Sequence, residues 1–164
     1  MIRVARPTDA AQLCTIYNHY VGNSVVTFEE VSVTTEDMVQ RIEKGIATMP
    51  WYVFEKDDEV LGYCYASARK TRSAYRHSVE STVYVSAGQG KQSVGTRLYQ
   101  RLLADLRARG IHVVLAGIAL PNLASVALHQ KLGFMQVAQL REVGRKFDRW
   151  VDVGYWELML PEDS

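Results

Sequence analysis

The segment from residue 79 to residue 96 most constrains how this chain can fold. It joins a β-branched strand pattern to an amphipathic helix pattern through a short loop that contains Gly and Ser. The first backbone N–H groups of a helix have no partner within the helix and carry a partial positive charge. A strand, a turn and a helix in this order therefore predict a phosphate-binding site at the turn.

Three polar side chains recur at helical spacing further along the chain. Asn122, Ser125 and His129 stand at positions i, i+3 and i+7, so one helix would present an amide, a hydroxyl and an imidazole on the same side. The pair Gly133-Phe134 follows that helix. A phosphate site beside a proton carrier predicts a group-transfer reaction.

The other patterns alternate between strands and helices. Strands are expected at residues 2–6, 51–55, 60–67, 78–85, 111–120, 134–142 and 149–160. Helices are expected to begin near residue 9 and to span residues 34–44, 94–109 and 122–132. The nearly continuous apolar run at 111–120 predicts the central strand, and 144–148 should form a turn-rich connection. The order predicts a single α/β domain over residues 1–164, with a mixed sheet flanked by helices.

Charge and cysteine content exclude several classes of protein. The chain carries 19 basic and 18 acidic side chains, a net charge of +1, so no long-range field favours nucleic acid as a partner. Arg3 and Arg6 precede any long apolar run, from which we expect a cytoplasmic protein without a leader or a membrane segment. Cys14 and Cys64 stand in unrelated contexts, without a second Cys or a His at metal-ligand spacing, so we expect neither a disulfide nor a metal site.

Residues 90–95 resemble the cofactor signature of the Gcn5-related N-acetyltransferase (GNAT) family, Gln/Arg-x-x-Gly-x-Gly/Ala. Gly95 matches its last position, whereas Gly90 and Ser93 replace the leading Gln or Arg and the middle Gly. The resemblance implies a GNAT-like fold with a mostly antiparallel sheet. It also implies acetyl-CoA as co-substrate, with binding weakened or compensated rather than lost at the altered positions. The residues implied to bind the coenzyme are Val83, Tyr84, Val85, Lys91, Gln92, Ser93, Val94, Gly95, Thr96, Asn122 and Ser125.

The second GNAT signature, Asn-x-x-Ala-x-x-x-Tyr-x-x-x-Gly-Phe, is matched in spacing over residues 122–134, with Ser125 for Ala and His129 for Tyr. Further matches cover nearly the whole chain and are similar to the phosphinothricin acetyltransferase subgroup. They are NHY at 18–20, PW at 50–51, KTRSAY at 70–75, VESTVYV at 79–85, LPN at 120–122, LH at 128–129 and WVDVGYW at 150–156. The resemblance implies acetylation of the α-amine of a small amino-acid analogue by direct transfer in a ternary complex. Phosphinothricin, methionine sulfone and methionine sulfoximine are the candidate substrates.

Glu80 and His129 are the candidate catalytic residues. Acetyl transfer needs a neutral amine, a stabilised oxyanion and a proton for the departing thiolate. Strand alternation places Glu80 on one face with Tyr84, and the resemblance implies that Glu80 is the general base. His129 could assist deprotonation or protonate the thiolate, and the sequence leaves this choice open. A solvent-facing glutamate and a hydrogen-bonded helix histidine are the structural alternatives. The resemblance further implies an oxyanion donor near Tyr84 or Val85 and contacts from Asn122 to the pantetheine amides.

The substrate is expected to meet a basic rim just before the strand at 78–85. Arg, Lys and His side chains crowd residues 69–77 around Tyr75, and guanidinium groups bind planar carboxylates in pairs. The resemblance implies that Arg72 and Tyr75 bind the substrate and that Phe28 lines the same pocket. The segment 145–150 either closes this pocket or forms a dimer contact.

The aromatic C-terminal strand and the habit of the family favour a homodimer that acts on a small-molecule amine. Two other functions stay open. One is acetylation of a peptide N-terminus or a polyamine, which the basic rim disfavours. The other is a non-catalytic CoA-binding regulatory domain, which the altered positions Gly90 and Ser93 suggest.

Overall fold

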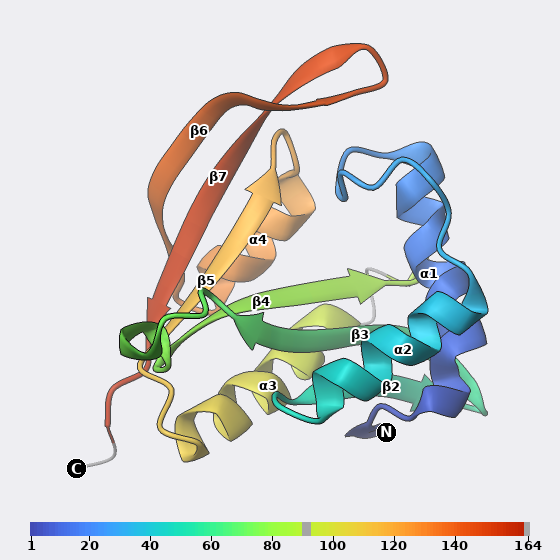
Figure 1. The fold of residues 1–164 in the computed structure, drawn as a ribbon, viewed down its shortest axis with the longest axis horizontal. Coiled ribbons are helices and arrows are strands. Elements are labelled where there is room, and N and C mark those ends of the chain that lie inside the picture. The colour runs from blue at the N-terminus through green and yellow to red at the C-terminus, as the bar shows by residue number, and fades with distance from the viewer. Residues whose placement is uncertain (90–92, 163–164) are drawn as a thin grey trace.

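The structure, a computed structural model, describes residues 1–89 and 93–162, which form one seven-stranded sheet with helices on both faces (Figure 1). The elements in chain order are β1 (Ile2–Val4), η1 (Pro7–Asp9), α1 (Ala10–Asn23), α2 (Thr35–Ile46), β2 (Trp51–Lys56), β3 (Glu59–Ala68), η2 (Ser73–Tyr75), β4 (Ser78–Val85), α3 (Val94–Ala108), β5 (Val113–Ala119), α4 (Leu123–Lys131), β6 (Met135–Lys146) and β7 (Arg149–Met159). This order confirms the expected alternation of strands and helices. No helix within the described ranges is long and apolar enough to cross a membrane.

The sheet has the strand order β1-β2-β3-β4-β5-β7-β6, and every neighbouring pair is antiparallel except β4 with β5. The parallel pairing is short, running from Ser78 opposite Val113 to Glu80 opposite Leu115. The expectation that residues 111–120 form the central strand is wrong, because β4 takes the middle place and β5 lies beside it. An apolar run reports burial, which any inner strand shares, and does not fix the place of a strand in the order.

Two apolar clusters place the helices on opposite faces of the sheet. On one face, Leu13 of α1 and Ile42 of α2 pack with Val53 of β2. On the other face, Leu98 of α3 packs in a cluster with Leu61 of β3. Burial of apolar surface on both faces therefore holds β4 and its neighbours as a rigid support for the site (Figure 1).

Local signals in the sequence account for several element boundaries. The hydroxyl of Thr34 accepts a hydrogen bond from the backbone N–H of Asp37 at 3.1 Å, which caps α2 where a cap was expected. Asp57 and Asp58 adopt φ values of 51° and 63° and join β2 to β3 as the expected hairpin. Gly110, with φ of 77°, follows the end of α3.

The β6–β7 hairpin is longer than the sequence suggests. Pairing continues to Lys146 opposite Arg149, so the expected connection at 144–148 is wrong for its first three residues. Phe147 and Asp148 alone make the turn, with φ values of 52° and 57°. Figure 1 shows this hairpin projecting past the rest of the sheet toward the loop between α1 and α2. We call residues 143–151, the end of the hairpin, the arm.

Candidate active site

The gap between β4 and β5 forms a small cavity of about 100 Å³. The backbone N–H of Ser86, just after β4, donates to the carbonyl oxygen of Leu61 in β3 at 2.8 Å. Alternate residues of a strand direct their backbone groups to opposite neighbours. Val85 therefore directs its N–H toward the gap, whereas Tyr84 directs its N–H toward β3. Of the two expected oxyanion donors, Val85 faces the space that a ligand could enter.

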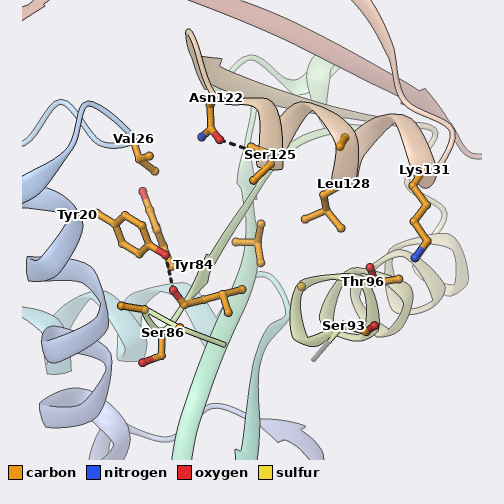
Figure 2. Close-up of a pocket in the computed structure, with 17 residues that line it drawn as sticks. Tyr20, Val26, Tyr84, Ser86, Ser93, Thr96, Asn122, Ser125, Leu128 and Lys131 are labelled. Atoms are coloured by element: carbon orange, nitrogen blue, oxygen red, sulfur yellow. Dashed lines mark hydrogen bonds between the residues drawn. The ribbon is translucent and has the colours of Figure 1, made fainter. Parts of the chain in front are cut away.

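A larger cleft of about 500 Å³ adjoins this gap, between the end of β4, the start of α3 and the length of α4 (Figure 2). The residues that line both spaces are Val26, Val83, Tyr84, Asn122 and Ser125. Tyr20 of α1 closes one side of the cleft, and its hydroxyl donates to the carbonyl oxygen of Val85 (Figure 2). A ligand in the cleft can therefore extend into the gap beside β4.

The start of α3 offers free hydrogen-bond donors to the cleft. Ser93 precedes the helix in a left-handed conformation with φ of 58°. The N–H of Arg97 donates to the carbonyl oxygen of Ser93 at 3.0 Å. The N–H groups of Val94, Gly95 and Thr96 lie before this bond and have no acceptor within the helix. Such a turn, with the positive end of a helix behind it, is the geometry that binds phosphate.

Most of the expected coenzyme residues line the cleft. They are Val83, Tyr84, Val85, Ser93, Gly95, Thr96, Asn122 and Ser125. Lys91 and Gln92 lie outside the described residues. The side chain of Val94 does not line the cleft, because it is fully buried and packs beside Gly62 of β3. Only the backbone N–H of Val94 is left for a ligand.

Close packing against α4 explains why a glycine suits position 95. A Cβ atom there would lie 3.2 Å from Cδ2 of Leu128, which is tighter than an ordinary van der Waals contact. Gly95 therefore lets α4 approach the start of α3 closely, and this approach forms one wall of the cleft.

Sequence reasoning missed Tyr20, Val26 and Lys131 as residues of the cleft. Tyr20 ends the NHY match, which was the available signal, whereas no local pattern marks Val26 or Lys131. Figure 2 shows the ammonium of Lys131 directed toward the start of α3, where Ser93 and Thr96 lie. A positive side chain beside free helix N–H groups adds charge for holding a diphosphate.

His129 belongs to a chain of buried hydrogen bonds. Its Nδ1 lies 2.7 Å from the carbonyl oxygen of Ser125, which can only accept, so Nδ1 carries a proton. In the neutral imidazole, Nε2 then accepts from the Tyr99 hydroxyl at 2.8 Å. The Tyr99 oxygen in turn accepts from the Ser81 hydroxyl at 2.8 Å. Ser81 of β4 thus donates to Tyr99 of α3, and Tyr99 donates to His129 of α4.

Burial lowers the pKa of His129, because desolvation disfavours the charged imidazolium. The side chain is 2% exposed and lines the small cavity rather than the cleft. Asn122 and Ser125 line both spaces, and the side-chain amide oxygen Oδ1 of Asn122 accepts from the Ser125 N–H at 3.1 Å, which caps α4 (Figure 2). The amide and the hydroxyl therefore reach the cleft, while the imidazole lies deeper.

Glu80 lies on the other face of β4 from the hydrogen-bonded chain of His129. β4 pairs with β3 without a register shift, so Glu80 and Tyr84 share a face. The Tyr84 ring packs edge-on against Tyr17 of α1, whereas the His129 chain lies on the α3 side. A Glu80 carboxylate oxygen is 3.4 Å from Nη1 of Arg69, and its side chain is about one-third exposed. The two candidate catalytic groups therefore do not meet on one face.

The expected substrate residues line neither cavity. Arg72 and Tyr75 are exposed at η2, immediately before β4. Phe28 lies on the loop between α1 and α2, with its ring against Gly144 of the arm. In Figure 1, η2 lies near the start of β4, and the loop between α1 and α2 lies past its far end. The cleft and these three residues are separate features of the structure.

The comparison with known families decides what this site belongs to. Residues 2–154 match the family model described as an acetyltransferase (GNAT) domain. The chain belongs to the GNAT acetyltransferase family. It is 40% identical to the phosphinothricin N-acetyltransferase of Streptomyces viridochromogenes over 95% of this chain and 85% of that protein. It is 35% identical to an L-methionine sulfoximine/L-methionine sulfone acetyltransferase of Salmonella typhimurium over 99% of this chain and 96% of that protein.

A solved structure shares the fold. The phosphinothricin acetyltransferase of Sinorhizobium meliloti, solved in complex with acetyl-CoA, superposes with a TM-score of 0.94 at 31% identity, covering 100% of this chain and 90% of that chain. The expected fold, the enzyme class and the use of acetyl-CoA are thereby confirmed. The free N–H groups of α3 and the ammonium of Lys131 fit the diphosphate of that coenzyme. Within the described ranges, no three His, Cys, Asp or Glu side chains gather closely enough to hold a metal ion.

Proposed function

We propose that this acetyltransferase acetylates the α-amine of a small amino acid of the phosphinothricin, methionine sulfone or methionine sulfoximine type. The observation that carries the proposal is the near full-length similarity to enzymes named for these substrates. The cleft, the free N–H groups at the start of α3 and the carboxylate of Glu80 support the proposal.

Glu80 is the proposed general base. Acetyl-CoA supplies an acyl carbon activated as a thioester. The ammonium proton first passes to the Glu80 carboxylate directly or through water. The neutral amine nitrogen then forms a bond to that acyl carbon as the C–S bond breaks, and a further proton of the nitrogen passes to the departing thiolate, which leaves as the free thiol of CoA. Glu80 shares a face of β4 with Tyr84, whose side chain reaches the cleft. Four strand residues span about 13 Å, so an amine beside Tyr84 would need a chain of several waters to reach Glu80, and an amine deeper in the gap would need fewer.

The N–H of Val85 is the proposed donor to the developing oxyanion, because it faces the gap that adjoins the cleft. We propose that His129 either accepts a proton during the reaction or stays neutral and holds its hydrogen-bond partners in place. Its lowered pKa and its two hydrogen bonds favour the neutral imidazole over an imidazolium that would protonate the thiolate. Phe28, on the loop past the far end of β4, is the proposed contact to the amino-acid substrate. Arg72 and Tyr75 stay proposed substrate contacts, but η2 lies near the start of β4, at the other end of the strand from Phe28.

We further propose a homodimer formed through β6. This strand ends the sheet, and its residues up to Val143 are all exposed. The exposed apolar side chains of this edge are Met135, Val137, Leu140 and Val143. A long exposed strand edge with apolar side chains is a template for pairing with another chain, and a second copy is the simplest occupant. Sedimentation of the protein tests this, and a monomer at micromolar concentration would contradict it.

A coupled assay of thiol release tests the substrate class. Purified protein and acetyl-CoA are incubated with L-phosphinothricin, methionine sulfone or methionine sulfoximine, and in parallel with common amino acids, a short peptide and a polyamine. We expect the highest kcat/KM on the first three. Preference for the peptide or the polyamine would overturn the substrate class. Calorimetric binding of acetyl-CoA without turnover on any amine would instead indicate a regulatory CoA-binding domain.

A further inference from the structure

Lys146 of the arm is buried although its side chain ends in an ammonium group. It is 2% exposed, and its Nζ donates to the backbone carbonyl oxygen of Thr27 at 2.8 Å. The two residues are 119 positions apart in the chain, so this bond ties β6 to the loop between α1 and α2. Burial also lowers the pKa of Lys146, because the charged form loses its hydration. The hydrogen bond to the Thr27 carbonyl replaces part of the hydration that the covered ammonium loses.

Thr27 is held from several sides. Its hydroxyl lies 2.8 Å from the Tyr17 hydroxyl and accepts from the N–H of Glu29 at 3.2 Å. The Glu29 carboxylate is paired with the guanidinium of Arg41 at 2.6 Å. These contacts fix the side chain of Thr27 and the residues after it. Only the bond from Lys146 fixes its carbonyl among the described contacts, and that carbonyl belongs to the same rigid peptide plane as the N–H of Phe28.

The arm also touches the ring of Phe28 directly. A Cβ atom at Gly144 would lie 2.3 Å from Cε2 and Cζ of that ring, so the ring lies flush against the glycine backbone. Gly144 and Lys146 are two positions apart on β6 and therefore face the same way, toward the loop. Val151 of β7 adds an apolar contact in a small buried cluster with Val25 of the loop.

We propose that Lys146 is a positioning residue for the amine substrate: it latches the peptide between Thr27 and Phe28 to the arm, and Gly144 provides the flat surface that sets the ring of Phe28. This rests on the proposed function, in which Phe28 contacts the substrate. The segment at 145–150 thus shapes the substrate side of the site through the loop between α1 and α2. Lys146 and Gly144 contact Thr27 and Phe28, and neither residue lines the diphosphate end of the cleft at α3.

The main test replaces Lys146 by Met, which keeps an unbranched side chain one atom shorter and removes its donors. We expect the KM for the amine to rise about tenfold, the scale of a lost hydrogen bond from a charged donor, while kcat and the Kd of acetyl-CoA stay within about twofold. Lys146→Arg, which keeps a charged donor, should recover part of the loss. Lys56→Met is the matched control, because Lys56 is an exposed lysine at the end of β2.

We call the hydrogen bond from Lys146 to the Thr27 carbonyl the latch. Hydrogen exchange tests the latch independently of the proposed function. In Lys146→Met, the backbone amides of residues 26–29 should exchange about tenfold faster at unchanged global stability, and this readout needs no substrate. Gly144→Ala should displace the ring of Phe28 and raise the amine KM without faster exchange at Thr27. If no amine is turned over but exchange rises, the substrate assignment fails and the latch stands.

Two results would overturn the latch. One is unchanged exchange and unchanged amine KM in Lys146→Met. The other is an equal loss of amine KM, acetyl-CoA binding and thermal stability, which would make Lys146 a general structural residue. If Lys146→Met does not fold, Lys146→Arg and Gly144→Ala still decide the matter through the same two readouts.

Discussion

Removing the hydroxyl of Tyr99 should cost stability out of proportion to the one atom lost. Tyr99 is fully buried, and its hydroxyl both donates to Nε2 of His129 and accepts from Ser81, each at 2.8 Å. In Tyr99→Phe, Nε2 of His129 keeps its lone pair without a donor, because Nδ1 already donates to the Ser125 carbonyl. A buried polar group left without its partner costs about 1–3 kcal/mol.

We therefore expect Tyr99→Phe to lower the free energy of unfolding by about 2 kcal/mol. For a chain of this length, such a loss lowers Tm by about 4–8 °C. Urea denaturation followed by circular dichroism measures the change, provided that the slope against urea concentration stays constant. The matched control is Tyr52→Phe, because the Tyr52 hydroxyl donates to the Asp105 carboxylate at 2.8 Å, and that carboxylate keeps its hydrogen bonds from Arg109 when the hydroxyl is removed. The control should lose less than about 1 kcal/mol.

A double variant tests the coupling between Ser81 and Tyr99. Ser81→Ala leaves the Tyr99 oxygen without its donor, Tyr99→Phe leaves the Ser81 hydroxyl without its acceptor, and neither of these two groups remains in the double variant. The double variant should therefore lose less than the sum of the single variants by about 0.5–3 kcal/mol. If Tyr99→Phe costs no more than Tyr52→Phe, the buried chain has no energetic role and the inferred proton positions are wrong.

Three further predictions concern catalysis, pH and the coenzyme. Glu80→Gln should lower kcat by about 10²–10⁴-fold and leave acetyl-CoA binding intact in calorimetry, and full activity would remove Glu80 from the role of base. The lowered pKa of His129 makes the unfolded chain bind a proton first, so stability should fall as pH drops below about 6.5 in wild type but less in His129→Gln, as shown by urea midpoints. Lys131→Met should raise the Kd of acetyl-CoA about fivefold and reduce the salt dependence of binding, and an unchanged Kd would remove Lys131 from the diphosphate site.

Local chemistry made much of the fold predictable. The cap at Thr34, the hairpin turn at 57–58 and the glycine after α3 each depend on neighbours within a few residues, so the sequence alone carries them. The same holds for the diphosphate end of the cleft, because a strand, a turn and a helix start are consecutive in the chain. The positions of Ser93 and Gly95 in the cleft follow from that order.

The rest depends on contacts between distant segments, which periodicity does not report. Lys146 is polar, yet it is buried where a carbonyl 119 residues away accepts its hydrogen bond. Pairing with β7 extends β6 through residues that were expected to form a turn. His129 lies deep because Tyr99 of α3 covers it. The side of the sheet that Glu80 faces depends on which helices cover that face, and no pattern within β4 states this.

β4 and β5 separate beyond their short parallel pairing, and each strand stays paired on its other side. β4 keeps its antiparallel partner to Val85, and β5 keeps its partner β7 from Val113 to Ala119, so each strand separates without losing its support. Only the backbone groups that face the gap lose a strand partner, and a buried group without a partner costs about 1–3 kcal/mol. Water or a ligand must supply those bonds. A bound coenzyme that does so should stabilise the fold in proportion to the logarithm of its concentration over Kd, and an acetyl-CoA titration that leaves Tm unchanged would show that nothing binds there.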